Sequence, residues 1–257
     1  PVTIPHTNIV LPHHNFDNAE YQFISTYRKR FALPEPRNGR RVYLDFDGAM
    51  IACTVYLNGH RLGDHEGGYT PFSFDLTDYL NENGDNLLTI MLDSTERPDI
   101  PPYGGVVDYL TFGGIYRDVR LRYVDPVHIT DVFVKTKDVL TGQPKVEVDV
   151  TLKNQTAAQV KQLVTAILIT PDVDDRVIQQ AEITVEAHEQ ATYTLHFDGL
   201  SSKKLWELHQ PTLHYMNVVS QQAGDNSETD HVTVPFGFRE AEFRDDGFYL
   251  NGEKIQL

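Results

Sequence analysis

Short stretches of alternating apolar and polar residues recur through the first half of the chain. Alternation puts every second side chain on the same face, which is typical of a half-buried β-strand. Such strands are predicted at Val42/Leu44/Phe46, Ile51 to Leu57, Phe72/Phe74, Leu88/Ile90 and Val119/Leu121/Tyr123.

Turn signals separate these strands. Asn-Gly dipeptides, which favour tight turns, fall at hairpin-like spacing at Asn38-Gly39, Asn58-Gly59 and Asn83-Gly84. The one helical hint in this half is a single turn from Asp75 to Leu80, which Asp75 can cap. Regular short strands with such punctuation predict a β-sandwich or jelly roll.

The alternation becomes cleaner after Asp125-Pro126, which predicts a domain boundary there. Apolar positions then recur at Val127/Ile129, Val132/Val134, Val146/Val148/Val150/Leu152, Ile183/Val185, Tyr193/Leu195/Phe197 and Val232/Val234. About seven strands over roughly 110 residues are typical of an immunoglobulin-like sandwich. Trp206 is interpreted as a core or inter-domain anchor.

The composition is typical of two packed domains, and the net charge limits the kinds of partner that we expect the chain to bind. The 257 residues include 37 Asp+Glu against 22 Lys+Arg, a formal charge of -15 that repels phosphate backbones, so we expect no nucleic acid partner. No stretch reaches the roughly 20 apolar residues of a membrane span, and no signal peptide opens the chain, so a cytoplasmic setting is favoured. Cys53 is the only cysteine, interpreted as a buried small hydrophobe, and no intrachain disulfide can form.

Candidate chemistry is confined to the loops. The segment Pro98 to Phe112 is long, aromatic and stiffened by proline, and its acid Asp108 lies among apolar neighbours, as suits a binding surface on a rigid scaffold. The loop Gly63 to Pro71 holds His65-Glu66 but lacks the second histidine of a zinc helix. His13-His14 point apart on a strand, and the acids at 172–175 lack the glycine of a calcium loop. We therefore predict no catalytic residue and no metal ligand.

The last 22 residues, Phe236 to Leu257, resemble the opening of another domain. They pass through the turn dipeptides Asp246-Gly247 and Asn251-Gly252 and stop in what looks like a strand. The prediction is that the chain is the front part of a longer protein.

Specific strings carry a family resemblance along the whole chain. They are IPHTN (4–8), YRKRF (27–31), FDG (46–48), VYLNGHRLGDHEGGYTPFSFDLT (55–77), FGGIYRDVRL (112–121), LWELHQPTLHY (205–215), FGFRE (236–240) and DGFYLNGEKIQL (246–257). In this order they resemble family 2 glycoside hydrolases, the β-galactosidase and β-glucuronidase family. The resemblance implies a sugar-binding jelly roll over 1–124, an immunoglobulin-like sandwich over 125–235, and at 236–257 the start of a TIM barrel that is absent.

The resemblance also implies a function, and PPYGG before Asp108 looks most like the β-galactosidase branch. Asp108 matches an acid that contacts sugar hydroxyls in the barrel's active site, and Asn8 matches an asparagine that also reaches the sugar. Catalysis in the family is retaining hydrolysis by two glutamates on the barrel. Glu240, Glu242 and Glu253 precede any complete barrel strand, so this portion is expected to be inactive on its own.

Other interpretations stay open at this stage. The chain could come from a β-glucuronidase, or be a free-standing carbohydrate-binding module with a platform of Tyr103, Tyr109 and Phe112. The two domains could also serve the assembly of a homo-oligomer. Within these residues we expect no cofactor; a need for Mg or Na ions would rest on residues beyond Leu257. The expected partners are a β-galactoside and the chain's own TIM barrel.

Overall fold

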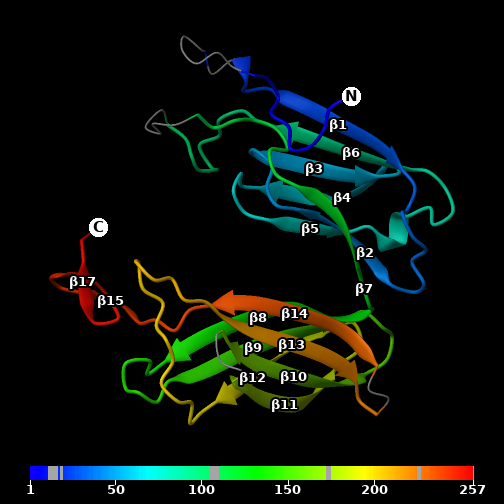
Figure 1. Ribbon diagram of the computed structural model, residues 1–257. Helices are drawn as coiled ribbons and strands as arrows, with labels where there is room; N and C mark the ends of the chain where they lie inside the picture. The colour runs from blue at the N-terminus through cyan, green and yellow to red at the C-terminus, as the bar shows by residue number, and fades with distance from the viewer. Residues whose placement is uncertain (11–16, 18–19, 105–109, 172–174, 225–226, 257) are drawn as a thin grey trace. The chain divides into compact units, whose positions relative to one another are not determined.

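The chain forms two compact units, Pro1–Val124 and Asp125–Leu257 (Figure 1). The structure is a computed structural model that describes residues 1–10, 17, 20–104, 110–171, 175–224 and 227–256. Its regular elements are strands, apart from single 3-10 turns. The prediction of an all-β protein built from β-sandwiches is therefore confirmed.

The first unit contains two antiparallel sheets with strand orders β1-β6-β3-β4 and β5-β2-β7. Inward-facing side chains of both sheets form one apolar cluster, with Phe46, Leu57 and Leu92 almost fully buried. The elements of this unit are β1 (Ile24–Phe31), β2 (Arg41–Phe46), β3 (Ala52–Leu57), β4 (His60–Glu66), β5 (Phe72–Asp75), the 3-10 helix η2 (Thr77–Tyr79), β6 (Asn86–Asp93) and β7 (Val119–Val124).

The five strands predicted in this unit all occur, as β2, β3, β5, β6 and β7. Strands β1 and β4 were missed, because their core-facing rows mix apolar and polar residues. On β1 that row is Ser25, Tyr27, Lys29 and Phe31. The segment expected to be a loop from Gly63 lies within β4 as far as Glu66. The turn expected after Asp75 is η2, whose Thr77 amide donates to Asp75 Oδ1 at 3.0 Å.

The Asn-Gly signals have different outcomes. Asn58 and Gly59 have φ of 51° and 86° and join the paired strands β3 and β4, as a two-residue hairpin requires. Asn38-Gly39 also has two positive φ angles but joins β1 to β2, which lie in different sheets. Gly84 is not among the positive-φ glycines of the described residues. A dipeptide signal therefore identifies a turn without fixing which strands pair across it.

The second unit contains a sandwich of seven strands with sheet orders β11-β10-β13-β14 and β12-β9-β8, followed by the small sheet β15-β16-β17. Its core includes Val148, Val150, Leu152 and Phe197, each fully buried. The strands are β8 (Val127–Lys137), β9 (Lys145–Asn154), β10 (Val160–Thr170), β11 (Asp175–Val185), β12 (Gln190–Phe197), β13 (His214–Gln222), β14 (Glu228–Phe236), β15 (Ala241–Arg244), β16 (Gly247–Leu250) and β17 (Glu253–Ile255).

The predicted strand count for this sandwich is right, but the membership differs. Val127/Ile129 and Val132/Val134 belong to one strand, β8, whose register shifts between Ile129 and Asp131. Such a bulge inserts an unpaired residue and breaks the alternation. Strands β10 and β13 were not recognised, because polar residues occupy some of their buried positions. Asn251-Gly252, with φ of 51° and 80°, joins β16 to β17 as expected.

Candidate functional site

Two motifs far apart in the sequence meet within the first unit. The segment 6–8 runs beside 113–115, with His6 N donating to Ile115 O at 2.8 Å and Asn8 N donating to Gly113 O at 2.8 Å. Gly114 in turn exchanges main-chain hydrogen bonds with Met50. The PHTN and FGGI strings are thus two halves of one structural feature.

The side chain of Asn8 is the centre of a polar network. Its Nδ2 donates to Ser94 Oγ at 2.9 Å, while its Oδ1 accepts from Tyr27 OH at 3.1 Å and from Ser25 Oγ at 3.3 Å. Ser94 is buried and gives its own hydrogen to Met50 O at 2.9 Å, so it can only accept from Asn8. The network therefore fixes which side of the Asn8 amide is nitrogen.

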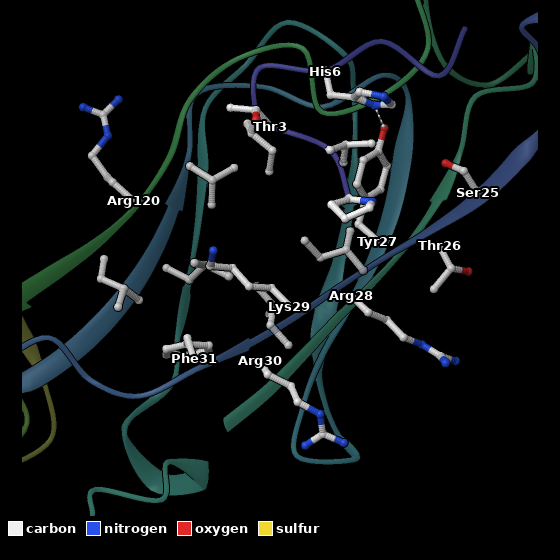
Figure 2. A pocket seen from close by; sticks show the side chains of 18 of the residues that line it. Thr3, His6, Ser25, Thr26, Tyr27, Arg28, Lys29, Arg30, Phe31 and Arg120 are labelled. Carbon is white, nitrogen blue, oxygen red and sulfur yellow. Dashed lines mark hydrogen bonds between the residues drawn. The ribbon is translucent and has the colours of Figure 1, made fainter. Parts of the chain in front are cut away.

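His6 joins the network through Tyr27 (Figure 2). Its Nδ1 lies 2.9 Å from Tyr27 OH, and the two rings meet edge to face with centroids 5.7 Å apart. Because the single hydroxyl hydrogen of Tyr27 goes to Asn8, the consistent arrangement has His6 Nδ1 as the donor. Burial raises the pKa of Tyr27 above its ordinary value, opposed by a hydrogen bond with the Ile115 main chain. Tyr27 thus stays a neutral hydroxyl.

Two glycines allow the motifs to approach this closely. A Cβ built on Gly113 would lie 2.6 Å from Ser94 Cβ and 2.7 Å from Asn8 Nδ2. At Gly114, φ is +120° and a Cβ would lie 2.5 Å from His6 O. Neither position has room for a side chain, so the Gly-Gly pair is required for the contact between the two segments.

Of the two predicted site residues, Asp108 lies outside the described residues, as does Tyr109. Asn8 is half-buried, and the network uses three of the four hydrogen-bonding positions of its amide. Among the residues that the structure describes, the second Nδ2 hydrogen has no acceptor, so this is the position left for another partner. Sequence reasoning selected Asn8 for its match to a family motif and missed its three partners.

The segment that leads toward Asp108 is well anchored where it is described. Ile100 is buried against Met50 and Ile51 in a small apolar cluster. Arg97 pairs with Asp99 at 2.6 Å and with Glu66 at 3.2 Å. Exposed aromatic side chains stand on both sides of residues 105–109: Tyr103 is 50% exposed and Phe112 is 45% exposed. Tyr103 and Phe112 therefore present aromatic surface next to a fixed segment.

His65, the residue that resembled a zinc ligand, has a structural role. Its ring stacks on Phe72 with centroids 3.8 Å apart, and its Nε2 lies 3.0 Å from Gly67 O. Burial lowers the pKa of His65 below its ordinary value. Among the described residues, no group of three or more His, Cys, Asp or Glu side chains could hold a metal ion. A helix long and apolar enough to span a membrane is likewise absent from the described part of the chain.

The class that the structure defines is an all-β chain of two β-sandwiches in tandem. The family model for the sugar binding domain of glycosyl hydrolases family 2 matches residues 5–126, and a second model of that family matches residues 127–239. The chain belongs to glycosyl hydrolases family 2.

Named relatives agree with this assignment. The chain is 37% identical over 259 residues to a β-galactosidase of Thermoanaerobacterium thermosulfurigenes and 34% identical over 258 residues to one of Thermoanaerobacter pseudethanolicus. Each match covers the whole chain but only 35% and 34% of the relative, so the chain spans about a third of their length. A solved β-glucuronidase of Bacteroides uniformis superposes with a TM-score of 0.87 at 27% identity, covering 100% of this chain and 31% of that one.

Proposed function

We propose that this chain is the non-catalytic N-terminal part of a retaining β-galactosidase-like hydrolase that cleaves terminal β-D-galactosides. One observation carries the proposal: the two family models follow one another without a gap from residue 5 to residue 239, and the relatives at 34% and 37% identity are named β-galactosidases. Those relatives are about three times as long. The two catalytic glutamates and the TIM barrel that holds them are therefore proposed to lie outside these residues.

The first unit is proposed to supply one wall of the sugar site. Asp108 would reach sugar hydroxyls, because a carboxylate accepts two hydroxyl hydrogen bonds without an opposite charge to desolvate. The fixed positions of Ile100 and Arg97, which precede Asp108 in the sequence, support this role. Asn8 would donate its second Nδ2 hydrogen to the same ligand.

Hydrolysis of chromogenic substrates tests the proposal. The 257-residue chain should release no chromophore from a β-galactoside, whereas a longer protein that contains it should turn over. In that longer protein, Asp108→Ala should lower kcat/KM about 10- to 150-fold, from the roughly 1.5–3 kcal/mol of hydrogen bonds to a charged group. Asp131→Ala, the same change at an exposed acid of the second unit, is the control. Turnover by the short chain, or equal kinetics of Asp108→Ala and Asp131→Ala, would contradict the proposal.

A β-glucuronidase parent is the second candidate, favoured by the similarity to the Bacteroides uniformis enzyme. The same assay distinguishes the two when a chromogenic β-glucuronide is run beside the β-galactoside. A free-standing carbohydrate-binding module is the third candidate, favoured by the exposure of Tyr103 and Phe112. Calorimetry with galactosides tests the module, because micromolar binding by the isolated chain would favour it over the enzyme part.

A further inference from the structure

Four Asn-Gly dipeptides occur in the chain, at Asn38-Gly39, Asn58-Gly59, Asn83-Gly84 and Asn251-Gly252. The pair is chemically reactive as well as turn-forming, because glycine has no side chain that keeps its main-chain nitrogen away from the amide carbon of the preceding asparagine. For the nitrogen to reach that carbon, the asparagine side chain must turn back onto its own main chain. Hydrogen bonds and turn geometry therefore decide which of the four pairs can react.

The side-chain amides of Asn58 and Asn251 are held on both sides. Asn58 Oδ1 accepts from Leu87 N at 2.8 Å, and its Nδ2 donates to Tyr79 O at 2.8 Å. Asn251 Oδ1 accepts from Glu240 N at 3.0 Å, and its Nδ2 donates to a main-chain carbonyl at 3.0 Å. Two neutral hydrogen bonds have to break before either side chain can turn, which slows the reaction about 30-fold.

Asn38 lies in a closed turn but its side chain is not held. It shares its backbone conformation with Asn58 and Asn251, since φ is 51° at all three, yet its amide has no hydrogen-bond partner among the described residues. The turn is closed by Arg40 N, which donates to Arg37 O at 3.0 Å. Ring closure requires rotation about the Cα–C bond of the asparagine, which a closed two-residue turn resists. Asn38 is thus restrained by its turn alone.

Asn83 is restrained in neither way. Its side chain has no hydrogen-bond partner in the described part of the chain, and neither Asn83 nor Gly84 has the positive φ of the other three pairs. The main-chain bond that closes this turn, from Gly84 N to Asn81 O, is 3.4 Å long and therefore weak. Asn83 and Gly84 are both exposed, so the two reacting groups and water are available together.

We propose that Asn83-Gly84 is a site of spontaneous deamidation. The Gly84 nitrogen forms a bond to Asn83 Cγ, the Cγ–Nδ2 bond breaks, and ammonia leaves with the proton lost from the Gly84 amide. Water then opens the resulting succinimide at one of its two carbonyls, which gives aspartate or isoaspartate. The product adds a carboxylate between Glu82 and Asp85, and isoaspartate also lengthens the main chain before Gly84, whose carbonyl accepts from Asn86 Nδ2 at 3.3 Å. This modification is independent of the glycosidase activity proposed above.

Incubation of the folded 257-residue chain in mildly alkaline buffer, followed by peptide mass spectrometry, tests the proposal. Asn83 should be converted to acid fastest, and Asn38 should follow. Asn58 and Asn251 should react about 30-fold more slowly than Asn38, because they share its turn and differ in their side-chain hydrogen bonds. In urea the four positions should react at similar rates, since each then presents the same reacting pair without the fold.

Gly84→Ala is the matched variant. Gly84 lies outside the positive-φ region and a Cβ there would be 3.9 Å from Asn81 Cβ, so the variant should fold, while its methyl group hinders attack by the nitrogen. Conversion at Asn83 should be lost over the same incubation, and conversion at Asn38 should not change. No conversion at Asn83 in the unsubstituted chain, conversion there no faster than at Asn38 or Asn58, or the same order of rates in urea as in the folded chain overturns the proposal.

Discussion

Replacement of Asn8 by alanine tests whether the polar network holds the first unit together. The substitution removes the amide that accepts from Tyr27 and Ser25 and donates to Ser94. Ser94 keeps Met50 O as its acceptor and loses a donor, whereas Tyr27 and Ser25 are left with hydroxyl hydrogens that need a new acceptor. The cost therefore falls on groups that stay inside the structure.

The magnitude follows from the geometry of the three bonds. The N–H bond at 2.9 Å is of normal length, the Tyr27 hydroxyl bond at 3.1 Å is slightly long, and the Ser25 hydroxyl bond at 3.3 Å is the longest. Two neutral bonds at about 1 kcal/mol each give a loss of about 2 kcal/mol for Asn8→Ala. Tyr27→Phe removes the bond to Asn8 and also the hydroxyl that contacts His6 Nδ1 and the Ile115 main chain, so it should cost about 2–3 kcal/mol. Ser25→Ala should cost less than about 0.5 kcal/mol, so the three variants form a graded series.

The chain contains two natural probes that report on different units. Cys53 is the only cysteine and is buried in the first unit, so its labelling by a thiol reagent in urea reports the opening of that unit. Trp206, the only tryptophan, reports on the second unit by fluorescence. With a urea slope of about 1.5 kcal/mol per molar, Asn8→Ala should lower the Cys53 midpoint by more than about 1 M and leave the Trp206 midpoint in place.

The reasoning fails if the Cys53 midpoint does not move. Asn8 would then contribute nothing to the folded unit, and its match to a sugar-contacting asparagine would be its whole role. Equal losses for Ser25→Ala and Asn8→Ala would also contradict the graded series, since the weakest bond would then matter as much as the entire network.

Three further predictions use the same probes. Burial raises the pKa of the Cys53 thiol to about 12, so the native chain at pH 8 should not react with a thiol reagent until urea opens the first unit; rapid native labelling would contradict this. Burial lowers the pKa of His214 from an ordinary value near 6.5, so the unfolded chain takes up the proton first as the pH falls. The free energy of unfolding of the second unit, followed by Trp206, should be full above about pH 6.5 and decline below it, with a shallower slope in His214→Phe. Gly114→Ala, with φ of +120° and a carbonyl oxygen 2.5 Å from the new Cβ, should cost more than about 2 kcal/mol at the Cys53 midpoint, against about 1 kcal/mol for Gly104→Ala, where the space is open.

Strands could be predicted from the sequence where the buried row is entirely apolar. Val146, Val148, Val150 and Leu152 of β9 are all at most 1% exposed, and their alternation is visible without a structure. The pattern fails where polar groups satisfy one another inside the sandwich. Gln162 of β10 and Ser220 of β13 are an example, with Ser220 Oγ donating to Gln162 Oε1 at 3.1 Å across buried positions.

His214 is another polar residue at a buried position of β13, and it is surrounded by aromatic side chains. It is fully buried, meets Phe238 edge to face at 4.8 Å, and its Nε2 lies 3.1 Å from Lys204 O. A histidine in this position interrupts the apolar alternation, although it packs as a core residue. Because such a side chain is stabilised by partners distant in sequence, local periodicity cannot identify it.

The candidate site was predictable only in part, for a related reason. A family match selects Asn8 as a residue, but its network joins positions 17 to 86 residues apart, which no spacing rule brings together. The Gly113-Gly114 pair is the one local signal, since adjacent glycines between larger residues indicate a close approach of another main chain.

The family resemblance implies sugar binding for both Asn8 and Asp108, but the contacts of Asn8 also give it a role in folding. PHTN and FGGI contact each other through Asn8, Gly113 and Gly114, so both motifs are explained by the folding of the first unit without any sugar. Asp108 enters no such explanation, and its role rests on the proposed function alone. Substitutions in the network should therefore lower the Cys53 midpoint whatever the substrate is. A substitution at Asp108 should change kcat/KM in the longer protein and leave the Cys53 midpoint unmoved. This difference distinguishes a residue that stabilises the fold from one that binds the substrate.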